Sequence, residues 1–216
     1  MQTPQFLHPL DPLPTPSTSS GPSPSGGSQP LSGTLGGFSM ERQEQDKWCW
    51  AAVSVSVAHF YGTSGWSQCT LAADELHLDC CSADGPVRGN SGCNRAWYLD
   101  SPLSRVGHLA RISWSFEGFP NVQNEINASQ PFCARIAWNG GGAHFVAVGG
   151  WSIDPIGTEF VDIYDPYYGF IQTPYATFLS AYRSSGDSWT HSYFTVAVGS
   201  PAGGGPAPTS NSPKSE

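Results

Sequence analysis

The sequence predicts an α+β domain in which a helical N-terminal half packs on a C-terminal antiparallel β-sheet. Residues 49–128 contain segments whose apolar residues recur at helical spacing. From residue 132 onward, short β-branched or aromatic runs alternate with Gly, Pro, Asn and Asp, which is typical of antiparallel strands. Residues 1–38 and 200–216 are rich in Pro, Ser, Thr and Gly. We therefore expect a disordered leader, one folded domain over 39–199 and a disordered tail.

The first predicted helix begins at Cys49 and ends near Tyr61. Its apolar or small residues at positions 50, 53, 57, 58 and 61 share one helical face, and Gly62 suits the position after a helix end. The alternation of valine and serine over 53–57 also fits a strand, so this alternative stays open. Shorter helices are expected at 70–78, 94–103 and 121–128, with a loop at 80–94.

The strands of the predicted sheet follow the helices in the chain. Each is short, is rich in β-branched or aromatic residues, and is separated from the next by turn-forming residues. We expect them at residues 132–138, 144–151, 159–164, 170–172 and 193–198.

The charge of the chain argues against two classes of partner. The formal net charge is −8 with nine Lys and Arg residues, whereas nucleic acids and anionic membranes select basic surfaces. No apolar run is long enough to cross a bilayer. The N-terminus lacks the basic cluster and apolar core of a secretory signal peptide, so we expect export by a non-classical route or a cytoplasmic location. We also expect a monomer.

Four of the six cysteines cluster within 25 positions, at 69, 80, 81 and 93. They form one or two disulfides, which implies an oxidising destination, or a metal site with His77. The adjacent pair Cys80 and Cys81 argues against zinc, because structural zinc sites usually leave two to four residues between paired ligands. Cys133 lies in an apolar stretch and is expected to be a buried, inert thiol. We expect no metal and no cofactor.

Cys49 is the candidate nucleophile. A thiol attacks as the thiolate, and the start of a helix together with a nearby imidazolium favours that form. Gln43, six residues upstream, could donate its side-chain amide to a developing oxyanion alongside the Cys49 backbone N–H.

A thiol nucleophile needs a base, and the base needs a group that orients it. His8 lies in the leader, and His59 lies near the far end of the Cys49 helix, so neither reaches Cys49. His144 follows a glycine run and leads a strand, which is a common place for a functional residue. Asp165 ends the next strand with the same parity as its apolar residues, and Pro166 stops that strand. Each residue alone is more often structural, but their combination predicts an acyl-transfer site.

Four short stretches carry a resemblance to a known family. The core 48–52, Trp-Cys-Trp-Ala-Ala, resembles the nucleophile helix of papain-like cysteine peptidases, above all the compact bacterial branch that includes a plant-pathogen effector peptidase. Residues 92–94, Gly-Cys-Asn, and 142–146, Gly-Ala-His-Phe-Val, are similar to further papain motifs. Residues 164–166, Tyr-Asp-Pro, resemble the ending seen in bacterial members and double-glycine peptidases.

The resemblance implies a papain-like fold with a defined set of site residues. Cys49 would be the nucleophile, His144 the base and acid, Asp165 the orienting residue and Gln43 part of the oxyanion hole. Two departures matter. Asp46 stands where papain has a disulfide cysteine, and Asp165 precedes Pro166 where papain has asparagine followed by tryptophan. Papain's disulfide pattern therefore does not transfer. Residues 1–38 also lack the helical pattern of an inhibitory propeptide.

Three functions of different kinds follow from these residues. The leading prediction is an endopeptidase that acts on peptides or proteins through a thioester at Cys49. The alternatives are a transglutaminase-like or other acyl transferase on the same triad, and a non-catalytic binding module of the same fold. The junction Leu35-Gly-Gly-Phe38 is a candidate self-cleavage site, or else part of a passive linker. We expect the tryptophans nearest these motifs to belong to the core, namely Trp48, Trp50, Trp138 and Trp151.

Overall fold

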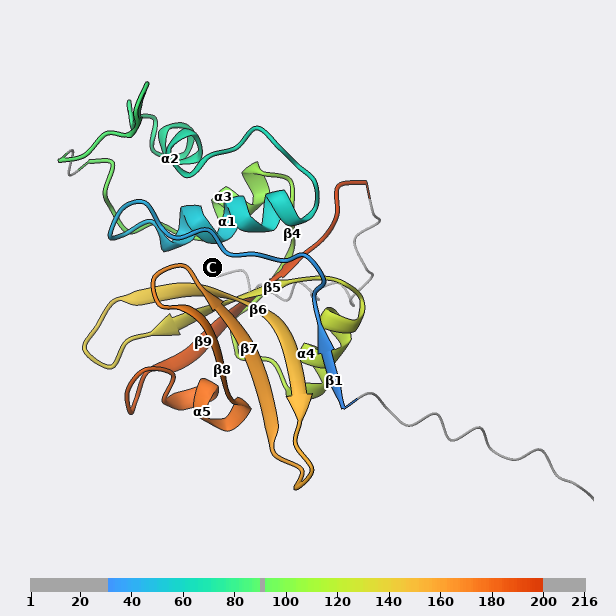
Figure 1. The fold of residues 1–216 in the computed structure, drawn as a ribbon. Coiled ribbons are helices and arrows are strands. Elements are labelled where there is room, and N and C mark those ends of the chain that lie inside the picture. Colours follow the sequence, from blue (N-terminus) through green and yellow to red (C-terminus); the bar gives the residue numbers. More distant parts are fainter. Residues whose placement is uncertain (1–30, 90–91, 200–216) are drawn as a thin grey trace, which may run out of the picture.

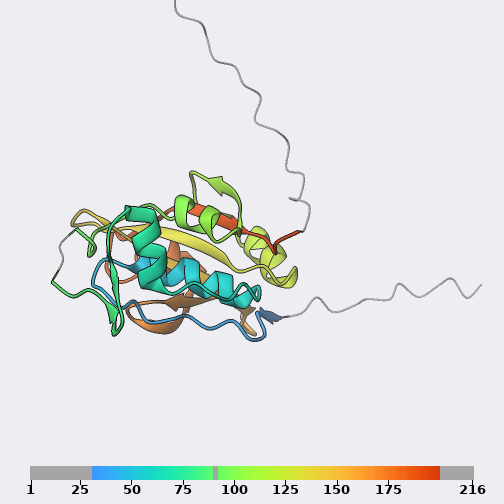
Figure 2. The same cartoon turned by 90° about the horizontal axis from the view of Figure 1, so that it is seen from above.

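The computed structural model describes residues 31–89 and 92–199. It consists of a helical layer on one side of a seven-stranded sheet (Figure 1). The helical layer contains α1 (Cys49–Phe60), α2 (Gln68–Leu76) and α3 (Asp100–Arg105), and Figure 2 shows these helices lying over the strands. The predicted combination of helices with an antiparallel sheet is therefore confirmed.

The sheet runs in the order β4-β9-β5-β6-β7-β8, and every pairing in it is antiparallel. A seventh strand, β1 (Ser32–Thr34), pairs with β6. Two short helices, α4 (Phe119–Asn127) and α5 (Tyr175–Ser180), pack against the strands away from the helical layer. A two-stranded ribbon of β2 (Cys81–Ser82) and β3 (Gly85–Pro86) lies near α2. The six main strands are β4 (Leu109–Ser113), β5 (Phe132–Ala137), β6 (Ala143–Ile153), β7 (Glu159–Asp165), β8 (Gly169–Pro174) and β9 (Ser188–Thr195).

Residues 53–57 are helical, which resolves the helix-or-strand ambiguity in favour of the helix. Helix α1 is buried from Cys49 through Ala58, so its serines need partners inside the protein. Ser54 and Ser56 donate their hydroxyl hydrogens to the carbonyl oxygens of Trp50 and Ala52, at 2.8 and 2.7 Å. These bonds within the helix explain why an alternating Val-Ser sequence is compatible with a buried helix.

The prediction of a disordered leader up to residue 38 was wrong at its C-terminal end. Strand β1 pairs with β6 through Gly150–Ser152, beyond the part of β6 that β5 covers. Leu35 and Phe38 belong to the core, and Phe38 makes edge-to-face contacts with Phe60 and Tyr164. The folded unit thus begins before residue 39, and the candidate cleavage junction lies within it. Residues 1–30 lie outside the described part of the chain.

The predicted helix at 94–103 was also wrong, because α3 begins only at Asp100. Residues 93–98 form neither helix nor strand, and the carbonyl oxygens of Cys93 and Arg95 accept hydrogen bonds from the start of α1. The prediction also missed strand β4 and helix α5, as well as the short strands β1, β2 and β3. The helix expected at 70–78 is α2, whose N-cap is Ser67. The Ser67 hydroxyl accepts the Thr70 N–H, and the Thr70 hydroxyl accepts the Ser67 N–H.

Candidate active site

Cys49 is the first residue of α1 and is 8% exposed. Both neighbouring tryptophans are fully buried, and their indole N–H groups bond one loop segment that precedes α3. Trp48 donates to the Cys93 carbonyl oxygen at 2.7 Å, and Trp50 donates to the Arg95 carbonyl oxygen at 3.1 Å. The Trp-Cys-Trp pattern therefore fixes the start of the helix, and with it the position of the thiol. The core role predicted for these two tryptophans is confirmed.

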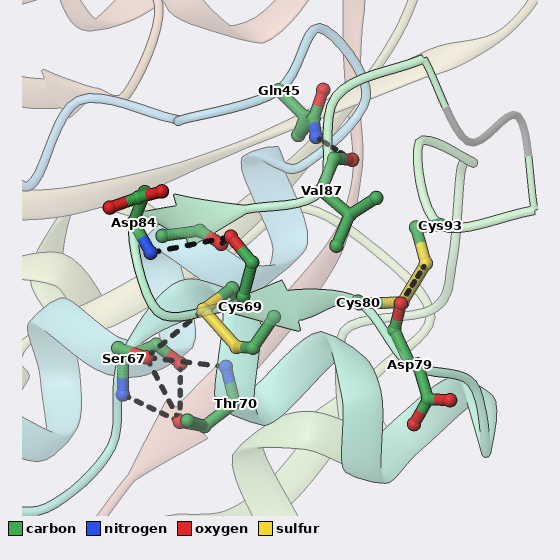
Figure 3. The surroundings of a disulfide bond; sticks show 12 residues. Gln45, Ser67, Cys69, Thr70, Asp79, Cys80, Asp84, Val87 and Cys93 are labelled. Atoms are coloured by element: carbon green, nitrogen blue, oxygen red, sulfur yellow. Dashed lines mark hydrogen bonds between the residues drawn. A yellow bond between two sulfur atoms is a disulfide. The ribbon is translucent and has the colours of Figure 1, made fainter.

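The segment that holds the two tryptophans is anchored by a disulfide. Cys80 bonds to Cys93, and Cys69 bonds to Cys81, which attaches the β2–β3 ribbon to α2 (Figure 3). Figure 3 also shows the Gln45 side chain donating to the Val87 carbonyl oxygen at 3.0 Å, which ties this loop to the segment before Cys49. The disulfide alternative is thus the one that the structure contains. The two free cysteines of the described residues are Cys49 and the buried Cys133.

His144 is the second residue of β6, at the end of a tight turn from β5. Gly141 and Gly142 in this turn have φ values of +93° and +85°, a region that favours glycine. The turn also places Trp138 against the imidazole, with the two rings stacked at a centroid distance of 5.5 Å. Trp138 is half-buried: it packs against the core, as predicted, and it also lines the hollow beside His144.

Asp165 ends β7, the antiparallel neighbour of β6, so its carboxylate lies at the same edge of the sheet as His144. The His144 Nε2–H donates to Asp165 Oδ1 at 2.9 Å. The same oxygen accepts the backbone N–H groups of Tyr167 and Tyr168, at 2.7 and 2.9 Å. The Tyr182 hydroxyl donates to Oδ2 at 2.9 Å. Four donors therefore hold a carboxylate that is 2% exposed.

The electrostatics of the site favour a charged imidazole. Burial alone lowers the pKa of His144, but hydrogen bonds to Asp165 and Cys49 and the charges of these two groups outweigh it and raise the pKa to about 9. Burial opposes ionisation of Asp165, yet His144 and the two backbone N–H groups hold its pKa below the usual value. Burial and the neighbouring Asp165 raise the pKa of Tyr182, which therefore keeps its proton. With Nε2 bonded to Asp165, Nδ1 is the nitrogen left for the Cys49 thiol.

Gln43 departs from its predicted geometry. Its backbone N–H donates to the Pro166 carbonyl oxygen at 2.9 Å, which ties it to the turn after Asp165. Its two side-chain amide hydrogens are donated to the carbonyl oxygens of Gln45 and Asp46, at 2.9 and 2.8 Å. The Oε1 atom is buried and has no hydrogen-bond partner among the described residues. The amide thus lies beside the site, but its donors are already in use.

Two hollows meet at Cys49. The larger, of about 640 Å³, lies between the helical layer and the sheet and extends over Trp97, Trp114 and Arg135. The smaller, of about 330 Å³, is lined by Gln43, His144, Trp138 and Tyr168 as well as Cys49. A chain lying across both hollows would pass directly over the thiol.

The residues that sequence reasoning missed are Tyr182 and the N–H donors of Tyr167 and Tyr168. The two backbone donors had a local signal, because an aspartate followed by Pro166 and a glycine at 169 favours a turn in which the carboxylate accepts the next N–H groups. Tyr182 had none, because it reaches Asp165 from beyond α5. Within the described residues, no group of three or more His, Cys, Asp or Glu side chains is arranged to hold a metal ion.

Comparisons with known proteins support the fold. No protein-family model matches the chain, and no curated protein matches it. Thirty-five chains of solved structures do match. One is the bromelain protease from Ananas comosus in complex with the E64 inhibitor, at 11% identity and a TM-score of 0.50. The match covers 78% of this chain and 100% of that chain. This chain thus has a fold similar to that of a papain-like cysteine protease, whereas the narrower resemblance to the bacterial branch stays a prediction.

No helix in the described part of the chain is long and apolar enough to cross a membrane. The two disulfides are of the kind that form in oxidising compartments.

Proposed function

We propose that this protein is a cysteine endopeptidase that cleaves peptides or proteins through a thioester at Cys49. The observation that carries the proposal is the chain of contacts from Cys49 to His144 to Asp165, buried at the junction of two hollows. Cys49 lies at the start of α1 with His144 beside it, which is the usual setting of a cysteine nucleophile. The two disulfides support export to an oxidising compartment as part of the same proposal.

In the first half of the reaction, the Cys49 sulfur attacks the substrate carbonyl carbon and the carbonyl oxygen takes the negative charge. The His144 imidazolium gives a proton to the leaving nitrogen as the C–N bond breaks, which leaves a thioester and a neutral imidazole. In the second half, His144 removes a proton from water, the hydroxide attacks the thioester, and the thiolate leaves. The products are the original ion pair and a carboxylic acid, which loses its proton to solvent.

The oxyanion needs donors, and the Cys49 backbone N–H is one, because the first N–H groups of a helix have no partner within it. We retain Gln43 as the second donor in this proposal. To act, it must exchange one of its bonds to the carbonyl oxygens of Gln45 and Asp46 for a bond to the substrate oxygen. Both bonds run to neighbours within three residues along the chain.

The central test is the selective reactivity of one thiol. Iodoacetamide and the epoxide E-64 should label Cys49 far faster than Cys133, as located by peptide mass spectrometry, and His144→Ala should abolish the rapid labelling. A peptide library should yield new N-termini with the wild type and with Cys133→Ala, but not with Cys49→Ala. Cys133 is the matched control, because it is the other free thiol of the described residues. Equal labelling of both thiols, or cleavage by Cys49→Ala, contradicts the proposal.

The role of Gln43 has a separate test. Alkylation of Cys49 by iodoacetamide forms no oxyanion, whereas peptide cleavage does. Gln43→Ala should therefore lower kcat/KM for a peptide about 100-fold while leaving the alkylation rate nearly unchanged. A parallel fall of both rates would mean that Gln43 only holds the loop before Cys49.

A further inference from the structure

The larger hollow beside Cys49 contains an arginine without an acidic partner. Arg135 lies on β5, in the middle of the sheet, and is half-buried. One of its five N–H donors bonds the Thr190 hydroxyl oxygen at 2.9 Å. None of the ion pairs formed by the described residues includes Arg135. A guanidinium in this state has donors available for a ligand that enters the hollow.

A β-bulge holds this arginine in place. The pairing of β5 with β9 shifts between Arg135 and Ile136, which leaves Thr190 as the extra residue of β9. The Thr190 hydroxyl donates to the Arg135 carbonyl oxygen at 3.2 Å and accepts the bond from the guanidinium. Bulges often re-aim side chains next to active sites. Here the bulge ties the Arg135 side chain to its own strand, at the floor of the hollow.

Among the described residues that line the hollow, Arg135 is the only one that is a cation near neutral pH. Burial and the charge of Arg135 lower the pKa of His191, the partner of Arg135 across the β5–β9 ladder. Asp100 lies on the opposite, helical wall. Tyr193 also lines the hollow. Burial and the charge of Asp100 raise the pKa of Tyr193 to about 12, although the charge of Arg135 lowers it.

The position of His144 determines which part of the substrate occupies each hollow. His144 lines the smaller hollow, and it must protonate the leaving nitrogen, so the leaving part of the substrate lies there. The acyl part, N-terminal to the scissile bond, then lies in the larger hollow over Arg135. At its rim, the exposed aromatic side chains of Tyr98 and Trp114 offer apolar surface to the same part of the substrate.

We propose that Arg135 binds a substrate carboxylate, so that the enzyme selects peptides with an acidic residue on the N-terminal side of the scissile bond. A carboxylate matches the planar guanidinium fork with two parallel N–H···O bonds. The partly enclosed, aromatic surroundings weaken solvent screening of this pair. This inference rests on the proposed peptidase function, because that function sets which part of the substrate lies over Arg135.

The test uses tripeptide acyloxymethyl ketones that alkylate Cys49, with Glu, Gln or Lys placed at each of the three positions in turn. At one position, the Glu probe should label Cys49 about tenfold faster than the Gln probe. Arg135→Gln should remove this advantage. Arg88→Gln, which deletes an exposed arginine outside the hollow, should keep it. Asp100→Asn should increase it, because a repelling charge is removed.

Three results overturn the inference. The first is that Glu and Gln probes label Cys49 equally fast at every position, or that no peptide probe labels it at all. The second is a Glu preference that survives in Arg135→Gln. The third is a Lys preference that Asp100→Asn abolishes. If Arg135→Gln fails to fold, equal labelling of the wild type by Glu and Gln probes still overturns the inference, and an increased Glu preference in Asp100→Asn still supports it. A Glu preference in labelling without hydrolysis of any peptide would refute the peptidase proposal and leave the assignment of Arg135 intact.

Discussion

Replacing Asp165 with asparagine should lower the upper pH limit of activity. The asparagine side-chain oxygen can still accept the three N–H groups that Oδ1 accepts, and the Tyr182 hydroxyl can turn to accept from the new amide. The substitution thus removes a charge while retaining the hydrogen-bonded geometry. It isolates the electrostatic contribution of the carboxylate to the protonation of His144.

The size of the effect follows from the pKa of His144. Its rise from 6.5 to about 9 corresponds to about 3 kcal/mol of favourable interaction with the charged imidazole. A hydrogen bond to a charged partner contributes about 1.5–3 kcal/mol and a neutral one about 1 kcal/mol. The change from carboxylate to amide therefore costs about 0.5–2 kcal/mol, which lowers the pKa of His144 by about one pH unit.

The assay is the pH dependence of kcat/KM for peptide cleavage. Cleavage needs the imidazolium, so the alkaline limb should lie near pH 9 in the wild type and about one unit lower in Asp165→Asn. Tyr182→Phe is the matched control, because it removes one hydrogen bond to Asp165 but keeps its charge. An alkaline limb that stays near pH 9 in a folded Asp165→Asn variant would refute the reasoning.

The same shift predicts how stability depends on pH. The pKa of His144 is higher in the folded chain than the 6.5 expected when unfolded, so protonation of His144 favours the folded state. Its contribution is fully present below pH 6.5 and is lost as the pH rises through about 9. Urea denaturation of Cys49→Ala and Asp165→Asn across this range would show a smaller change than in the wild type.

Two further predictions concern the scaffold around the site. Replacing Cys80 and Cys93 together with serine should cost about 3 kcal/mol of stability and slow the labelling of Cys49, because Cys93 holds the start of α1. The disulfide between Cys69 and Cys81 closes a loop of similar length and is the matched control. Its replacement should destabilise the protein by a similar amount but slow the labelling of Cys49 less. Equal slowing by both replacements would contradict the role given to Cys93. Phe38→Ala should cost about 3–5 kcal/mol in urea denaturation, whereas an unchanged unfolding midpoint would mean that residues 31–38 add nothing to the fold.

The sequence allowed prediction of the parts of the site whose position depends on local order. A cysteine at a helix start, a histidine at a strand start and an aspartate at a strand end each have a local signature. The antiparallel pairing of consecutive strands then brings His144 and Asp165 to one edge of the sheet. Parity was sufficient to choose Asp165 over Asp162, because a strand turns alternate side chains to opposite faces.

The parts that escaped prediction depend on long-range contacts. Tyr182 reaches Asp165 only after α5 has packed on the sheet, and no periodicity announces such a contact. Strand β1 consists of three residues in a Ser- and Gly-rich stretch. It is held by pairing with the part of β6 that β5 does not cover. The stretch 94–99 had a helical pattern but is not helical; the buried indole of Trp50 bonds the Arg95 carbonyl oxygen, and that of Trp48 bonds the adjoining Cys93. Tertiary contacts override local propensity at these positions.

The two tryptophans beside Cys49 and the donors around Asp165 serve the same purpose: each group holds one neighbour of the His144 imidazole in place. A buried imidazolium is costly, so it persists only if both of its neighbours are held where their charges reach it. Trp48 and Trp50 fix the thiol through backbone carbonyls that a disulfide anchors. On the other side, four donors fix the carboxylate of Asp165. Because neither neighbour can relax away, the interaction survives burial, and the pKa of His144 rises where burial alone would lower it.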